Sequence, residues 1–206
     1  MIRQKLKAVL AVGAVCIFLC ACGQSADGTK ETTMKLEEDG TIINTIIENF
    51  DETLYSADNL QNMMLDEVSA FNSTTGGKSI SIDKVEASEG QVEVVLIYAG
   101  ASVYEAFNEV TCFYGTMQEF YDAGIEKSGI TFYTKNGDVY GIEELLKLEG
   151  EQIIVLEKSK VEGTIKVETP SKILYASDNV EFLSNKSVRI PADTEELAYI
   201  IIKGSK

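Results

Sequence analysis

Histidine and tryptophan are both missing from this chain of 206 residues. Without histidine the chain cannot build a Ser-His-Asp triad or a Cys-His pair, and it has no histidine general base. A typical zinc site is excluded too, because carboxylates and one retained thiol do not supply a common set of four ligands. These absences remove the most frequent hydrolase and zinc-enzyme classes, and we expect no metal and no cofactor.

Cysteine is also scarce, and its placement is uneven. Cys16, Cys20 and Cys22 stand near the start of the chain, so Cys112 is the single cysteine in the remainder. One thiol cannot form an internal disulfide bond. Cys112 lies in Val110–Tyr114, where the residues alternate as in a strand. We therefore predict that it is a small buried apolar residue rather than a nucleophile.

The start of the chain has the pattern of an export signal. Three basic residues and no acidic ones occur in Met1–Lys7, and Ala8–Leu19 is entirely apolar or small. That apolar run is too short to span a bilayer comfortably, and a small-residue cleavage region follows it. The pattern predicts a cleaved signal peptide over residues 1–21 rather than a transmembrane helix.

The end of the apolar run carries a second signal, Leu19-Cys20-Ala21-Cys22. It resembles the lipobox of bacterial lipoproteins, with leucine three positions before the cysteine and a small residue just before it. The resemblance implies that the Cys22 thiol receives a diacylglyceryl group and that cleavage makes Cys22 the new N-terminus. The alternative is an ordinary cleaved signal in which this cysteine is a coincidence. We expect an extracytoplasmic protein whose partner is the lipid bilayer, through acylated Cys22.

The residues after the lipobox are polar and carry no apolar period. Ser, Thr, Gly, Lys and Glu dominate residues 22–34, which predicts a flexible tether between the lipid and the fold. Beyond the tether we expect two lobes, one over residues 35–128 and one over residues 129–206.

The charge balance limits the partners. Loss of the signal peptide removes three of the 18 basic residues, and the remaining 15 against 33 acidic residues leave a net charge of −18. Such a surface is repelled by nucleic acid and by anionic lipid, so nucleic acid is not an expected partner and the lipid must make the anchor. Cations and basic peptides remain open as partners.

The first lobe is predicted to have the element order β-α-β-β-α-β-α. A helix starting at Ser56 shows apolar residues at helical spacing, and Ser88-Glu89-Gly90 indicates a hairpin. The expected elements are strand 41–50, helix 56–72, strands 80–87 and 91–99, helix 102–108, strand 110–114 and helix 117–123.

The second lobe is predicted to be rich in strands. Asn136-Gly137 is the strongest hairpin signal of the chain. The expected strands are 130–135, 138–140, 152–157, 163–168, 172–175, 180–183, 187–190 and 197–203, with a helical turn at 142–147. Many short strands at near-regular spacing favour a sandwich or barrel-like lobe. The fold class is therefore α+β, either with two cores or with one core that both lobes share.

Three short segments imitate the motifs of penicillin-binding enzymes. Ser81-Ile-Asp-Lys84 matches Ser-x-x-Lys, Ser177-Asp178-Asn179 matches Ser-Asp-Asn, and Lys127-Ser128-Gly129 approximates Lys-Thr-Gly. That family places the serine at a helix start, whereas Ser81 lies in a predicted strand, and the order of the segments also differs. A carboxylate pair of the glycosidase type is equally open in so acidic a chain, but sequence does not identify one.

Aromatic residues cluster in the middle of the chain. They either form the core of the first lobe or provide a platform for sugar rings or a protein partner. Tyr114, Tyr121 and Tyr133 are the residues whose spacing leaves them free to be exposed.

Beyond the lipobox, two stretches carry a wider resemblance. Phe107–Thr116 and Ala198–Lys203 are similar to uncharacterised cell-envelope lipoproteins of Gram-positive anaerobes. This resemblance implies a location in the cell envelope and no particular activity. We predict a non-enzymatic module that binds an envelope ligand or protein. The alternative is a small cell-wall hydrolase or transpeptidase-like enzyme that uses carboxylates or the pair Ser81 and Lys84.

Overall fold

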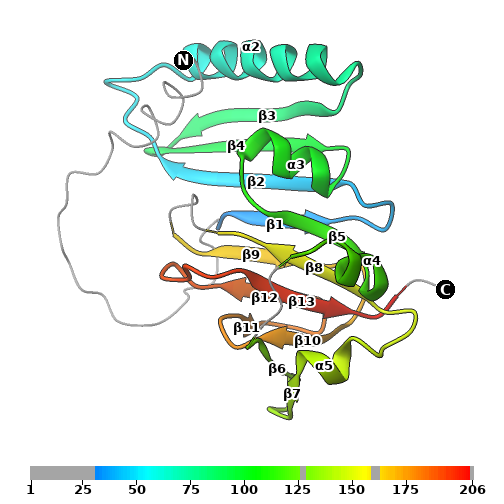
Figure 1. The fold of residues 1–206 in the computed structure, drawn as a ribbon. Helices are drawn as coiled ribbons and strands as arrows, with labels where there is room; N and C mark the ends of the chain where they lie inside the picture. The colour runs from blue at the N-terminus through cyan, green and yellow to red at the C-terminus, as the bar shows by residue number, and fades with distance from the viewer. Residues whose placement is uncertain (1–30, 126–128, 159–162, 205–206) are drawn as a thin grey trace.

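The computed structural model describes residues 31–125, 129–158 and 163–204. Within these ranges the chain forms thirteen strands in two sheets and four helices (Figure 1). The predicted α+β class is confirmed. Most predicted elements are present within a few residues of their expected bounds, because their apolar periods and turn residues agree with the fold.

The larger sheet has seven strands. They are β1 (Thr33–Leu36), β2 (Ile42–Asn49), β3 (Ile80–Ser88), β4 (Gln91–Tyr98), β9 (Ile165–Glu168), β11 (Glu181–Phe182) and β12 (Ser187–Ile190). Their order across the sheet is β11-β12-β9-β1-β2-β4-β3. All neighbours are antiparallel except β1 and β9, which run parallel with Thr33 opposite Lys166.

The smaller sheet has six strands. They are β5 (Cys112–Thr116), β6 (Thr131–Tyr133), β7 (Val139–Gly141), β8 (Gln152–Leu156), β10 (Ile173–Ser177) and β13 (Ala198–Ile202), in the order β5-β8-β13-β10-β6-β7. The central strands β8 and β13 are almost entirely buried. They read as continuous apolar runs because both of their faces are covered.

The four helices cover the sheets. They are α2 (Ala57–Thr75), α3 (Ala101–Asn108), α4 (Met117–Asp122) and α5 (Ile142–Leu145). In Figure 1, α2 runs alongside β3, with which it makes close contact. Its buried residues Met64, Val68 and Phe71 join the same hydrophobic cluster as Leu96 and Tyr98 of β4. The cluster that contains Phe120 and Phe132 packs on the other face of the smaller sheet.

The two expected lobes share one core. The main hydrophobic cluster extends from Met34 to Ile202 and draws on both sheets. Strands β9, β11 and β12 complete the sheet begun by β1–β4, while β5 joins the sheet formed by the later strands. The boundary at residues 128 and 129 therefore does not separate the two sheets. Long-range strand pairing of this kind leaves no local signal in the sequence.

The structure corrects the end of the expected tether. Thr33 and Met34 belong to β1, and Met34 is only 2% exposed. The Thr32 hydroxyl holds this start in place, since it accepts a hydrogen bond from the amide of Ile47 at 3.1 Å. A strand of four residues is too short for its alternation to stand out from a polar segment. The tether of the prediction can therefore occupy residues 22–30 at most.

Residues 1–30 lie outside the described ranges, and with them Cys22 and the expected signal peptide. Among the residues that are described, none of the helices is both long and apolar enough to cross a membrane. The signal peptide and the lipid on Cys22 remain predictions.

Candidate functional site

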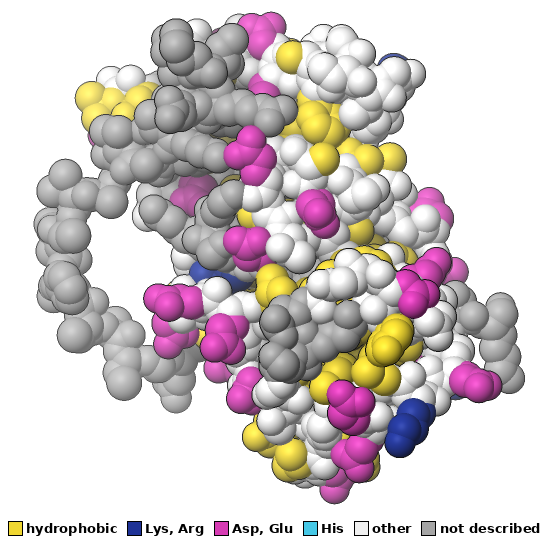
Figure 2. Space-filling model, viewed as in Figure 1, with side chains coloured by type: hydrophobic (Ala, Val, Ile, Leu, Met, Phe, Trp, Pro, Cys, Tyr) yellow, Lys and Arg dark blue, Asp and Glu magenta, His cyan; other side chains and the backbone are white. Residues whose placement is uncertain are grey.

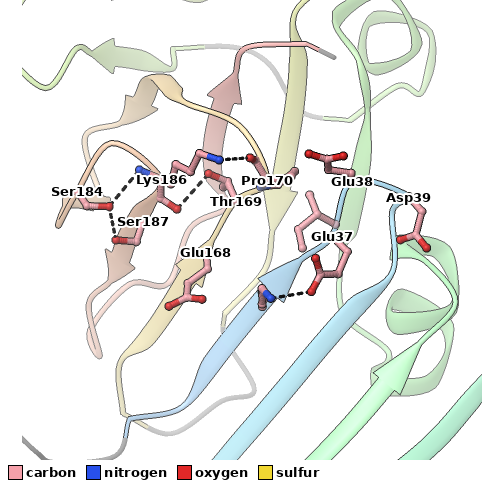
Figure 3. A pocket seen from close by; sticks show the side chains of 11 residues that line it. Glu37, Glu38, Asp39, Glu168, Thr169, Pro170, Ser184, Lys186 and Ser187 are labelled. Atoms are coloured by element: carbon pink, nitrogen blue, oxygen red, sulfur yellow. Dashed lines mark hydrogen bonds and ion pairs between the residues drawn. The ribbon is translucent and has the colours of Figure 1, made fainter. Parts of the chain in front are cut away.

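A groove of about 740 Å³ opens where β1 ends (Figure 3). Three segments line it, namely β1 with the turn that follows it, the loop after β9, and the loop that joins β11 to β12. The lining residues are Lys35, Leu36, Glu37, Glu38, Asp39, Glu168, Thr169, Pro170, Ser184, Lys186 and Ser187. Because β1 and β9 run parallel, their carboxyl ends reach the same edge of the sheet, which brings these distant segments together.

The turn from β1 to β2 forms one side of the groove. The amide of Glu37 donates to the carbonyl of Thr41 at 2.8 Å, and the amide of Gly40 donates to the carbonyl of Glu37 at 3.1 Å. Gly40 has a φ of 87°, a conformation that favours glycine. The Asp39 carboxylate accepts a hydrogen bond from the Thr41 amide at 2.9 Å. These bonds fix the backbone that presents the acidic side chains.

The other side is a pair of cross-linked loops. The amide and the hydroxyl of Thr169 both donate to the carbonyl of Lys186, at 2.9 and 3.1 Å. The Lys186 ammonium donates to the carbonyl of Pro170 across the gap. The hydroxyls of Ser184 and Ser187 lie 2.7 Å apart and bond to each other. The loops are therefore held by their own hydrogen bonds before any ligand binds.

The groove carries more negative than positive charge. Four of its lining residues are acidic and two are lysines. Lys35 pairs with Glu37 at 2.7 Å, and this pairing raises the pKa of Lys35. The hydrogen bond from the Thr41 amide lowers the pKa of Asp39, so this carboxylate is charged at neutral pH. The balance favours a ligand that brings positive charge.

The groove suits non-covalent binding. Its hydroxyls bond to each other or to backbone carbonyls, and the pKa of Lys35 is raised rather than lowered. Across the described ranges, no three cysteine and carboxylate side chains are grouped so that they could hold a metal ion. Sequence reasoning did not identify this groove, because only the parallel pairing of β1 and β9 assembles it.

The structure places Ser81 and Lys84 on β3, at one edge of the larger sheet. Ser81 is exposed, and a bulge separates the two residues. The Lys84 ammonium pairs with Glu86 at 2.7 Å and with Glu93 at 3.2 Å, and hydrogen bonds to these carboxylates raise its pKa. A catalytic base needs the opposite shift, so this lysine is poorly suited to activate a serine.

Ser177 has a structural role in the smaller sheet. Its hydroxyl donates to Asn179 Oδ1 at 2.6 Å and accepts from the amide of Tyr199 at 2.9 Å. Asn179 in turn donates to the carbonyl of Leu197 at 3.0 Å. Ser81 and Ser177 thus lie in different sheets, and Lys127 and Ser128 fall outside the described residues.

Cys112 is buried at the start of β5, as predicted. Burial raises the pKa of its thiol to about 12, and Glu105 adds to the shift. The Glu105 carboxylate also accepts a hydrogen bond from the Cys112 amide at 3.2 Å, which satisfies a backbone group on an edge strand. The thiol is therefore protonated at neutral pH and unreactive.

The three tyrosines do not form one platform. Tyr114 is half-buried on the edge strand β5, and its hydroxyl donates to Gln152 at 3.0 Å. Tyr133 is half-buried on β6, and β8, β13 and β10 separate it from β5. Tyr121 on α4 is 58% exposed. Most of the other central rings pack in the two cores, so the aromatic cluster is mainly structural.

Acidic side chains are dispersed over the face shown in Figure 2, with few basic ones among them. The dispersion agrees with a solvated acidic surface and does not mark a single carboxylate pair.

Comparisons with known proteins give little to set beside this geometry. No protein-family model matches the chain, and no curated protein matches it in sequence. A structural similarity is found to the folded domain of the LppM protein of Mycobacterium tuberculosis, determined by NMR. That similarity has a TM-score of 0.41 at 7% identity and covers 85% of this chain and 88% of that one. A similarity this weak supports no conclusion about activity or cellular location.

Proposed function

We propose that this protein is a lipid-anchored, extracytoplasmic binding module without enzymatic activity. Its ligand is a cationic segment of an envelope peptide or polymer, and the groove at the end of β1 is the binding site. The observation that carries the proposal is the preformed groove, in which two hydrogen-bonded loops face a turn that presents Glu37, Glu38 and Asp39.

Size and charge both favour this ligand class. Small-ligand sites commonly enclose about 300–1,000 Å³, and the groove, at about 740 Å³, lies within that range. Most of its lining side chains are charged or carry hydroxyls, so recognition can use charge and hydrogen bonds. Anionic ligands are disfavoured, because they would meet four carboxylates against two lysines.

The proposed extracytoplasmic location rests on the N-terminal sequence. Leu19-Cys20-Ala21-Cys22 resembles a lipobox, and nine positions separate Cys22 from Glu31, the first described residue. An extended chain of that length spans about 30 Å at most. The proposed anchor would therefore hold the folded part close to the membrane.

The anchor is tested by cell fractionation. The full chain expressed in a bacterial host should sediment with the membranes, and the Cys22→Ala variant should appear in the soluble or secreted fraction. Retention of Cys22→Ala in the membrane fraction would show that the anchor lies elsewhere.

The ligand class is tested by the thermal stability of the full chain, purified from membranes in a mild detergent. A short oligolysine peptide should raise the melting temperature in proportion to its concentration, because a ligand that binds the folded state stabilises it by mass action. Added salt should reduce the effect, since salt screens exposed charges.

A matched pair of variants locates the binding. Glu38→Lys places a positive charge in the groove and should abolish most of the shift, whereas Glu149→Lys makes the same charge change at an exposed loop residue outside it. Equal loss in both variants would mean that oligolysine responds only to the overall charge. No shift in the parent chain would overturn the proposed ligand class.

A further inference from the structure

The outer face of the larger sheet carries an apolar strip that neither core uses. Its members are Ile43 and Ile47 of β2 and Val95 and Ile97 of β4, and none of them belongs to either hydrophobic cluster. The helices that contact this sheet, α2 and α3, pack with residues of the opposite face, such as Leu96 and Tyr98. The strip therefore lies on the side of the sheet that faces away from the core.

The strand register makes the strip continuous. Ile43 stands opposite Ile97, Thr45 opposite Val95, and Ile47 opposite Glu93. Residues directly opposite each other share a face of a sheet and lie side by side. Thr45 is therefore at the centre of the strip, between Ile43 and Ile47 along β2 and beside Val95. Val95 is 9% exposed and the three isoleucines are half-buried, so the strip is flat rather than protruding.

Ion pairs flank the strip on two sides and form its rim. On the side of β3, Lys84 pairs with Glu86 at 2.7 Å and with Glu93 at 3.2 Å. On the side of β1, Lys35 pairs with Glu37 at 2.7 Å.

The rim continues on β9 and β12. Lys166 pairs with Glu168 at 2.8 Å, and Arg189 pairs with Glu31 at 3.3 Å. Each basic residue of the rim thus has a carboxylate partner on the same face. Arg189 also approaches Glu181 at 3.9 Å, so four basic residues meet six carboxylates here, a smaller excess of acid than the 18 basic and 33 acidic residues of the whole chain.

We propose that this outer face binds a second copy of the same chain, face to face, about a two-fold axis close to Thr45. An apolar centre within a polar rim is the common anatomy of a protein interface. Sheets pack face to face when their side chains interdigitate, and a two-fold interface uses the same patch on both copies. A rim that contains both signs can meet its own copy with less repulsion than the rest of this acidic surface would produce.

The flat shape and the paired rim argue against other occupants. Half-buried side chains on the face of a sheet do not reach into a bilayer as protruding loop residues do. A strongly basic partner would meet the like charges of Lys84, Lys166 and Arg189 on this face. A copy of the chain needs neither free carboxylates nor insertion.

The position of Glu31 supports the same occupant. The segment that leads to Cys22 joins the fold at Glu31, at the edge of this face. Copies held on one membrane would meet with these faces at a raised effective concentration. This raised concentration depends on the proposed lipid anchor, whereas the strip and its ion pairs do not, so the interface and the proposed function are tested separately.

The test measures the mass of the full chain in detergent by sedimentation equilibrium. The parent chain should sediment as a dimer. Ile97→Lys and Thr45→Lys each place like charges against each other across the axis, and each should weaken the dimer by about tenfold or more. The control is Val139→Lys, which adds the same charge at an apolar residue that is 59% exposed on β7, and it should remain dimeric.

Each outcome decides the proposal. A parent chain that stays monomeric up to high concentration overturns it, as does a parent chain that sediments with a different protein. A dimer that survives both Ile97→Lys and Thr45→Lys also overturns it, because the interface must then lie elsewhere. Thr45 is already polar, so Thr45→Lys guards against the case in which Ile97→Lys fails to fold. Circular dichroism melts confirm that each variant is folded.

Discussion

At the scale of single residues, burial and hydrogen bonding decide which candidate side chains can react. Cys112 is enclosed in the core and its thiol is protonated at neutral pH, with a pKa raised to about 12. Lys84 is held charged by two carboxylates. The hydroxyl of Ser177 donates a hydrogen bond to the Asn179 side chain and accepts one from the backbone amide of Tyr199. These observations favour structural roles for all three residues, and for Cys112 that role is the one its strand-like segment predicted.

The first prediction concerns Cys112. Iodoacetamide at mildly alkaline pH should leave this thiol unmodified in the folded chain and alkylate it rapidly in denaturant, because the thiolate is the reactive form. Peptide mass spectrometry of the Cys112 segment measures both rates. Similar rates in the two conditions would contradict the burial of Cys112.

A second prediction concerns Ser81. Fluorescent penicillin should not label the full chain, because Lys84 cannot take the serine proton while Glu86 and Glu93 hold it charged. Fluorescence of the chain on a denaturing gel measures this, with Ser177→Ala as the comparison variant. Labelling that disappears in Ser81→Ala would restore the transpeptidase-like alternative.

At the scale of elements, the end of α2 shows how the chain stops one structure and starts another. Gly76 takes a left-handed conformation with a φ of 74°, and its amide donates to the carbonyl of Asn72. The Asn72 side chain then accepts hydrogen bonds from the amides of Ser79 and Ile80, both at 2.9 Å. The glycine cap thus ends the helix, and the side chain of one asparagine fixes the short connection to β3.

The third prediction compares two adjacent glycines. Gly76→Ala should lower the free energy of unfolding by about 1 kcal/mol, because a β-carbon is disfavoured in the left-handed conformation. Gly77→Ala is the matched control, since a β-carbon there meets open space and the backbone is not in that region. Urea denaturation measures both, and equal losses would contradict the assigned cap.

The hairpins illustrate what local sequence can determine. The turn between β3 and β4 places Glu89 and Gly90 at φ angles of 54° and 76°, as a two-residue turn of type I′ requires. Asn136-Gly137 closes the hairpin of β6 and β7, with Gly137 at a φ of 90°. Both turns were predicted because their chemistry is confined to neighbouring residues.

At the scale of the whole molecule, the two sheets are each assembled from both halves of the sequence. Strand β1 lies between β9 and β2, and β5 pairs with β8. The groove and the outer face both result from this interleaving, because β1 and β9 contribute to each.

The fourth prediction follows from the shared core. Residues 31–128 and residues 129–206, produced separately, should each fail to fold cooperatively, since β9 and β12 are missing from the first and β5 from the second. Circular dichroism melts and limited proteolysis measure this. Mixing the two fragments should recover part of the ordered state. A cooperative melt of either fragment alone would contradict the single core.

The sequence by itself determined the features that neighbouring residues control. Helical spacing determined α2, turn chemistry determined two hairpins, and apolar runs determined the buried strands β8 and β13. The lack of histidine in the sequence excluded a histidine-based site, and the composition argued against a typical zinc site. The lipobox resemblance of Cys22 also comes from the sequence alone and remains a prediction.

Tertiary structure alone decided which strands are neighbours. The parallel pairing of β1 with β9 joins segments more than a hundred residues apart and builds the groove from Glu37 and Lys186. The register of β2 on β4 placed Ile43 beside Ile97 on an outer face, whereas a shift of one residue would have turned them inward. These outcomes depend on long-range packing, whose free energy is spread over the whole core and has no counterpart in any short stretch of sequence.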